Sequence, residues 1–190
     1  MTMPNIIRSL PLALALLLSA AGYTAPRTPD DIEVHVRKEG NRVHVDIELS
    51  VDASQEETWN VLTDYAGMAR FVPSVESSVV QRREGNQLEV SQNGKASRGP
   101  FSFRFANVRR VDLTPMREIH ARIVSGDLAP GEVTTTLNSA GPMTQVTVTG
   151  VYTPNIWVPP VIGPAIIAAE TKEQWQVLRK EIVRRRGAPG

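Results

Sequence analysis

The 190-residue sequence contains no cysteine, and this absence excludes several classes of protein. Without a thiol there is no disulfide framework, no thiolate nucleophile, no cysteine-ligated zinc and no lipid-modified cysteine after a leader. An excess of charge of one sign is also missing. The 21 basic and 20 acidic residues leave a net charge of +1, so we expect no nucleic-acid partner. The length predicts one domain with its own hydrophobic core.

Sequence motifs of common catalytic sites are absent as well. There is no Gly-x-Ser-x-Gly elbow, no phosphate-binding glycine loop, no His-Glu-x-x-His and no acidic cluster with metal-ligand spacing. The three histidines, His35, His44 and His120, alternate with apolar residues and are expected on the solvated faces of strands. We therefore expect no metal, no cofactor and no catalytic histidine.

The first 21 residues have the pattern of an export signal. Arg8 precedes an apolar run from Leu10 to Leu18, and Ser19-Ala20-Ala21 supplies the small residues that signal peptidase accepts. The run is short for a membrane span, although an uncleaved anchor is the alternative. The sequence predicts cleavage near Ala21, a tether over residues 22–31, and a mature protein that is either periplasmic or secreted.

Alternation of apolar and polar residues predicts a train of β-strands. Residues 32–38 and 43–51 alternate on both sides of Gly40, which predicts a hairpin with His35 opposite Asp46 and His44 opposite Arg37. Residues 32–38 would be an added edge strand. Further strands are expected at residues 75–83, 87–97, 101–113, 117–124, 132–138 and 144–152, joined as an antiparallel meander, with a bulge or a tighter turn at 93–94.

Two regions have helical signals. Ser54 and Glu57 form a capping box that opens a helix, and a short turn from Met68 to Phe71 follows before Pro73. A long helix is expected from about residue 160 to residue 186. The apolar side of this helix changes along its length. Either the helix has a kink, or its two halves pack against different parts of the protein. We favour two halves, the first covering a cavity and the second packed on the sheet. One side holds Val161, Ile162, Ala165, Ile166 and Ala169, and the other holds Trp175, Leu178 and Ile182.

The stretch from Val51 to Ser77 resembles the start of the START/polyketide cyclase-like superfamily of helix-grip proteins. The matching residues are Val51, Ala53, Glu57, Trp59, the run 61–65, Met68, Phe71 and Pro73. Over about residues 43–186 the resemblance is nearest to the coenzyme Q-binding and polyketide cyclase/dehydrase branch. It implies an α+β fold over residues 32–186, in which a curved antiparallel sheet wraps around a long C-terminal helix. Two short helices would follow the first family strand, and residues 187–190 would form a tail.

The resemblance also implies a ligand site between the sheet and the long helix, and apolar concave sites bind apolar ligands. The expected cavity residues are Phe71, Phe103, Phe105, Ile119, Val133, Leu137, Ile162, Ala165, Ile166 and Ala169, with Trp157 at the entrance. The alternative for each is that it only fills the core. Polar residues that could point inward are Glu173, Tyr65, Tyr152, Arg104 and Asp64, and Glu173 is the one candidate for a catalytic group.

Three functions fit these patterns. The first is an exported protein that binds a hydrophobic small molecule or lipid without transforming it, with an isoprenoid quinone as one candidate ligand. The second is a cyclase/dehydratase-type enzyme acting on an apolar or polyketide-like substrate. The third is an envelope interaction module that docks partners on the added edge strand. The basic end, Arg179 to Arg186, either complements the helix dipole or makes transient contact with anionic lipid.

Overall fold

The computed structural model describes residues 31–98, 101–155 and 162–187. The strands are β1 (Ile32–Glu39), β2 (Arg42–Val51), β3 (Val75–Glu84), β4 (Gln87–Arg98), β5 (Phe101–Thr114), β6 (Glu118–Gly126), β7 (Gly131–Ala140) and β8 (Met143–Tyr152). The helices are α1 (Gln55–Leu62), the 3-10 helix η1 (Tyr65–Gly67), α2 (Met68–Phe71) and α3 (Gly163–Arg185). In this described part of the chain, no helix is both long and apolar enough to cross a membrane.

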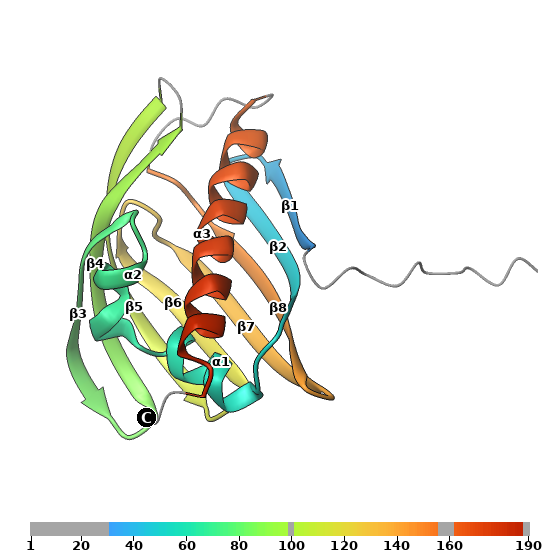
Figure 1. Ribbon diagram of the computed structural model, residues 1–190. Coiled ribbons are helices and arrows are strands. Elements are labelled where there is room, and N and C mark those ends of the chain that lie inside the picture. Colours follow the sequence, from blue (N-terminus) through green and yellow to red (C-terminus); the bar gives the residue numbers. More distant parts are fainter. Residues whose placement is uncertain (1–30, 99–100, 156–161, 188–190) are drawn as a thin grey trace, which may run out of the picture.

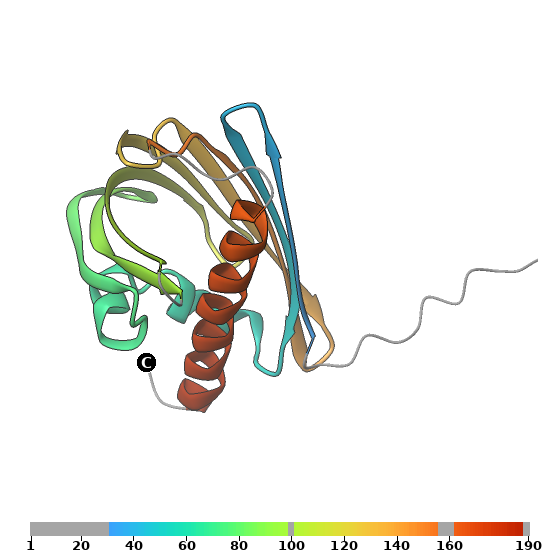
Figure 2. The same ribbon diagram turned by 90° about the horizontal axis from the view of Figure 1, so that it is seen from above.

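All of the strands belong to one antiparallel sheet in the order β1-β2-β8-β7-β6-β5-β4-β3. The sheet is curved, and α3 runs along its concave side (Figure 1, Figure 2). Helix α1 and the short helices η1 and α2 connect β2 to β3, which lie at opposite sides of the sheet. The α+β helix-grip fold expected from the sequence is therefore the fold of this protein.

The hairpin of β1 and β2 has the register that the alternation predicts. His35 lies opposite Asp46 and Arg37 lies opposite His44. The turn is made at Gly40, which has a φ of 58° that a residue with a side chain rarely adopts. β1 is the edge strand, and α3 packs against both β1 and β2. Because Ile32 is only 2% exposed, β1 contributes to the core as well as to the edge.

Helix α1 closes the end of the sheet where β7 and β8 meet. The Gln55 side-chain amide donates to the Leu137 carbonyl at 3.0 Å, and the Thr144 hydroxyl donates to the Ala53 carbonyl at 2.9 Å. The helix begins at the predicted capping box, so its first backbone amides are satisfied locally. Val61 of this helix is fully buried, so α1 covers the core at this end of the sheet.

The segment Asn93-Gly94 continues β4 instead of turning. The irregularity lies on the neighbouring strand β3, between Val75 and Ser77, which pair with Gly94 and Asn93. A Cβ atom on Gly94 would lie 1.9 Å from the Ser74 carbonyl oxygen. The glycine is thus required by the close approach of the chain at the start of β3, not by a turn.

Helix α3 is continuous over 23 residues, and its large buried side chains lie in its C-terminal half. Trp175, Leu178 and Ile182 are buried in the core. On the other predicted face, Ile162 and Ala165 are exposed, whereas Ile166 and Ala169 are half-buried, so only part of that face turns inward. Burial of the large side chains near the C-terminus sets the rotation of the whole helix, because it outweighs burial of a few small residues.

We expect the substitution Ile32→Ala to lower the free energy of unfolding by about 3 kcal/mol, because it leaves a cavity under a fully packed side chain. Urea denaturation followed by far-UV circular dichroism measures the change. Val79→Ala on β3 is the control, since this valine is 52% exposed and its truncation is expected to cost under about 1 kcal/mol. Equal costs for the two substitutions would show that β1 is not part of the core.

Candidate functional site: a cavity between sheet and helix

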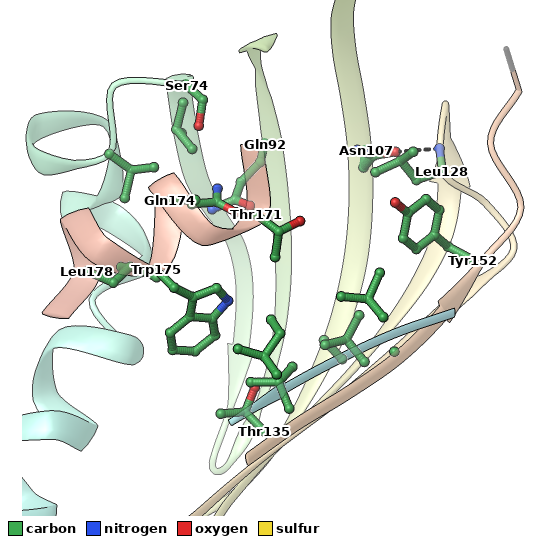
Figure 3. A pocket seen from close by; sticks show the side chains of 18 of the residues that line it. Ser74, Gln92, Asn107, Leu128, Thr135, Tyr152, Thr171, Gln174, Trp175 and Leu178 are labelled. Carbon is green, nitrogen blue, oxygen red and sulfur yellow. Dashed lines mark hydrogen bonds between the residues drawn. The ribbon is translucent and has the colours of Figure 1, made fainter. Parts of the chain in front are cut away.

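A cavity of about 350 Å³ lies between the concave face of the sheet and α3. Its walls come from β2, from β4 to β8, from the segment between α1 and β3, and from α3. Figure 3 shows Thr171, Gln174 and Trp175 on the side of α3 that faces the strands, with Asn107 and Tyr152 on the strands. Most of the wall is apolar, and the polar groups are few enough to be considered one by one.

Four of the residues expected at the cavity line it: Phe105, Ile119, Val133 and Ile166. They come from β5, β6, β7 and α3, which are brought together only by the curvature of the sheet. Apolar side chains from so many elements create a surface suited to an apolar ligand. Whether these four residues contact a ligand stays a prediction.

The other expected residues lie away from the cavity wall or outside the described part of the chain. Leu137 is packed in the core, and Phe71 lies under the guanidinium of Arg185, whose central carbon is 4.9 Å from the ring centre. On α3, Ala169 is half-buried but is not part of the wall. The Phe103 side chain and the whole of Trp157 fall outside the described residues.

The candidate catalytic carboxylate, Glu173, is exposed on α3 and does not reach the cavity. Glu170, almost one turn earlier, is half-buried and lines the wall. The prediction centred the inward face on Ile166 and Ala169, and Ile166 does line the wall. Glu170 lies on the same side of the helix, about 40° around the axis from Ile166 and about 140° from Trp175.

The four other polar candidates divide into two pairs. Tyr65 and Tyr152 line the cavity, as expected. Asp64 instead caps η1 by accepting from the Gly67 amide at 2.9 Å, and Arg104 is exposed on the far side of β5. Burial raises the pKa of Tyr65 and of Tyr152 to about 12. Both phenols therefore stay protonated at neutral pH and can donate hydrogen bonds, but they are poor bases.

Two further polar residues of the wall, Asn107 and Arg109, were missed in the sequence. They lie on β5 and share the inward face with Phe105, because side chains two residues apart point to the same side of a strand. Burial lowers the pKa of the Arg109 guanidinium, and Tyr65 beside it has the opposite effect. The signal was present, since the period of two that starts at the phenylalanines continues through positions 107 and 109.

The family model for polyketide cyclase / dehydrase and lipid transport matches residues 51–178. The chain belongs to this family. The match begins at the last residue of β2, so β1 and the rest of β2 precede the part that the family model covers. No curated protein sequence matches the chain.

Several solved structures have the same fold as this chain. The Zhui aromatase/cyclase from a Streptomyces species has a TM-score of 0.64 at 18% identity, over 78% of this chain and 99% of that chain. The STAR-related lipid transfer protein from Xanthomonas axonopodis has a TM-score of 0.66 at 13% identity, over 83% and 97%. A START superfamily protein from Mycobacterium smegmatis has a TM-score of 0.60 at 14% identity, over 74% of this chain and 97% of that chain. At these identities the likeness shows the fold alone.

In this member of the polyketide cyclase / dehydrase and lipid transport family, ion pairs hold the C-terminal end of α3. Glu181 binds both Arg184 and Arg185 at 2.7 Å, and Arg185 also reaches Asp64 at 3.0 Å. Arg185 thus connects α3 to the segment between α1 and α2. Tyr65 of this segment lines the cavity. These basic residues are used within the molecule, and contact with anionic lipid stays a prediction.

Substituting Glu181→Gln is expected to make stability less dependent on pH under acidic conditions. The two arginines hold the pKa of Glu181 at about 2, below its ordinary value of 4.5. A carboxylate with a lowered pKa stabilises the fold fully above pH 4.5 and loses this contribution as the pH falls through 2. The variant should lose on the order of 2 kcal/mol at pH 7 and show a flatter decline below pH 4.5.

The measurement is urea denaturation at a series of pH values. Glu56→Gln, which replaces an exposed carboxylate of α1, is the matched control and should keep the acid dependence of the unsubstituted protein. An unchanged decline in the Glu181→Gln variant would show that this carboxylate is not strongly paired.

Proposed function

We propose that the protein binds a small hydrophobic molecule between the sheet and α3 and releases it unchanged. The observation that carries this proposal is the cavity itself, because a space of about 350 Å³ falls within the range of about 300–1,000 Å³ found for small-molecule sites. The family, which includes lipid transport, supports the same kind of ligand.

The volume of the cavity favours a ligand with one ring system or one short chain. The cavity of about 350 Å³ lies near the lower end of the range of about 300–1,000 Å³ found for small-molecule sites. A two-chain lipid is too large to be enclosed. An isoprenoid quinone would place its ring inside and leave most of a long tail outside, which makes it a less suitable ligand than a compact molecule.

The polar groups of the wall favour binding over chemical conversion. The two tyrosines stay protonated at neutral pH, and Arg109 and the amides of Gln92, Asn107 and Gln174 are not bases. Among the described residues that line the cavity, Glu170 is the only carboxylate. A ligand would therefore meet donors that orient it and apolar walls that remove it from water, which is what sequestration requires.

Filling the cavity should weaken ligand binding without unfolding the protein. We expect Val133→Trp to weaken binding of the neutral apolar probe 1-aminoanthracene by at least about tenfold, equivalent to about 1.4 kcal/mol, because the indole takes up the space of the ligand. Probe fluorescence measures the dissociation constant. Val124→Trp, at a valine that is 45% exposed on β6, should leave it unchanged. Equal binding by both variants would place the ligand elsewhere.

The natural ligand is identified by native mass spectrometry and lipid extraction of the protein taken from its own envelope fraction. A small hydrophobic molecule at near-unit stoichiometry, recovered with its mass unaltered after incubation, is the expected result. Failure to bind this molecule, fatty acids or quinones would count against a carrier.

The alternative is a cyclase/dehydratase-type enzyme, and the position of Glu170 in the wall favours it. A carboxylate beside an apolar substrate can remove a proton from carbon when its surroundings raise its basicity. The same extraction decides between the two functions, because an enzyme returns a ligand that has lost water or closed a ring. Glu170→Gln would then stop the conversion and still bind the starting molecule.

We also propose that the protein works outside the cytoplasm. The support is the sequence of residues 1–21, with a basic residue, an apolar run and a small-residue site in the expected order. Sequencing the N-terminus of the protein from the envelope or the medium should show cleavage near Ala21. The third function, docking of a partner on β1, predicts a captured partner whose binding is lost when the outward-facing His35 and Arg37 are replaced.

A further inference from the structure

Two neighbouring side chains of the cavity wall have hydrogen-bond donors without acceptors. The Asn107 side chain is only 3% exposed, and its Oδ1 accepts from the Leu128 amide at 2.9 Å (Figure 3). Its Nδ2 is buried and has no partner. Two residues along the same face of β5, the buried Nε of Arg109 also has no partner. Buried donors are nearly always paired in folded proteins, so two together require an explanation.

Arg109 also lacks a counter-charge among the described residues. The outward-facing arginines of the same strand are paired, Arg104 with Glu76 at 3.4 Å and Arg110 with Glu89 at 3.7 Å. The ion pairs of the described part of the chain include none with Arg109. The Arg109 side chain is half-buried and its Nε is fully buried. A cation held in this way without a counter-charge is a candidate for binding an anionic group.

The groups around Arg109 do not supply the missing acceptor. Its pKa responds to burial and to the hydroxyl of Tyr65, and Glu170 on α3, although it lines the same cavity, is not among the groups that shift it. Tyr65 stays protonated and is a further donor. The guanidinium, the phenol and the Asn107 amide are therefore three sources of hydrogen-bond donors on a wall that is mostly apolar.

We propose that Arg109 and Asn107 bind the anionic oxygen of an amphipathic ligand, a carboxylate at the end of an apolar body that lies against Ile119 and Val133. This inference rests on the proposed function, because it names the class of molecule that the cavity takes. An arginine and an amide at a buried site bind a carboxylate through charge-assisted hydrogen bonds, which are about twice as strong as neutral ones.

The test compares ligands that share one chain and differ in the head group: decanoate, 1-decanol and decylammonium. Isothermal titration calorimetry is performed on the processed protein after expression of the full chain. Decanoate should bind at least about tenfold more tightly than decanol, because hydrogen bonds to its charged oxygens are stronger than those to a neutral hydroxyl. Decylammonium should bind most weakly. Decyl phosphate is included to distinguish a carboxylate from the phosphate of a lipid, and it should bind less tightly than decanoate.

Two substitutions assign the preference to β5. Arg109→Met keeps an unbranched side chain and should remove the advantage of decanoate over decanol, at least about tenfold. Asn107→Asp keeps an acceptor for the Leu128 amide and replaces the unpaired donor by a negative charge, so decanoate binding should be lost selectively. Arg110→Met is the control, because this neighbouring arginine faces away from the cavity, and it should leave the preference unchanged.

The outcomes separate this inference from the proposed function. If no member of the series binds, the cavity is not a site for small apolar ligands and both proposals fail. If decanol or decylammonium binds as tightly as decanoate, or if Arg109→Met keeps the preference, the carboxylate site is refuted and the carrier stands. Thermal unfolding of each variant checks its fold, and the preference of the unsubstituted protein decides the question even if a variant does not fold.

Discussion

The structure depends on the burial of one stripe of α3 against the concave side of the sheet. Trp175, Leu178 and Ile182 are buried, and each such side chain contributes about 1.5–3 kcal/mol relative to an exposed one. The ion pairs of Arg185 with Glu181 and Asp64 hold the same end of the helix. Because the C-terminal half is fixed in this way, it also sets where the N-terminal half of α3 crosses the sheet. The space that it leaves unfilled is the cavity.

Polar side chains on the sheet keep that space from being filled by apolar packing. The Gln92 amide donates to the Ser78 hydroxyl at 2.9 Å, which satisfies one buried group from within the sheet. Asn107 and Arg109 are not satisfied in this way, and moving α3 closer would bury them further at a cost of several kcal/mol for the charge. Asn107 and Arg109 thus disfavour closure of the cavity, and the same two residues can recognise a ligand.

The fold was predictable because its signals are local, whereas the cavity depends on tertiary packing. The capping box at Ser54 and the period of two along each strand act within a few residues, so the hairpin register came out correctly. The inward side of α3 was predicted only in part. Ile166 lines the cavity as expected, but Ile162 and Ala165 are exposed, because the packing of the helix against the sheet, not the apolar pattern, decides which residues turn inward. Arg109 was overlooked for a similar reason, since an arginine in a strand is usually on the solvated face.

The added strand β1 limits where a ligand can enter. It lies before the part of the chain that the family model covers, and α3 packs against it and β2, so these two strands cover one side of the helix. The ion pairs of Arg185 hold the C-terminal end of α3. The connection between β6 and β7 borders the cavity, where Leu128 forms part of the wall and its amide donates to Asn107 Oδ1. A ligand that binds Asn107 would therefore contact the residue that also positions this connection.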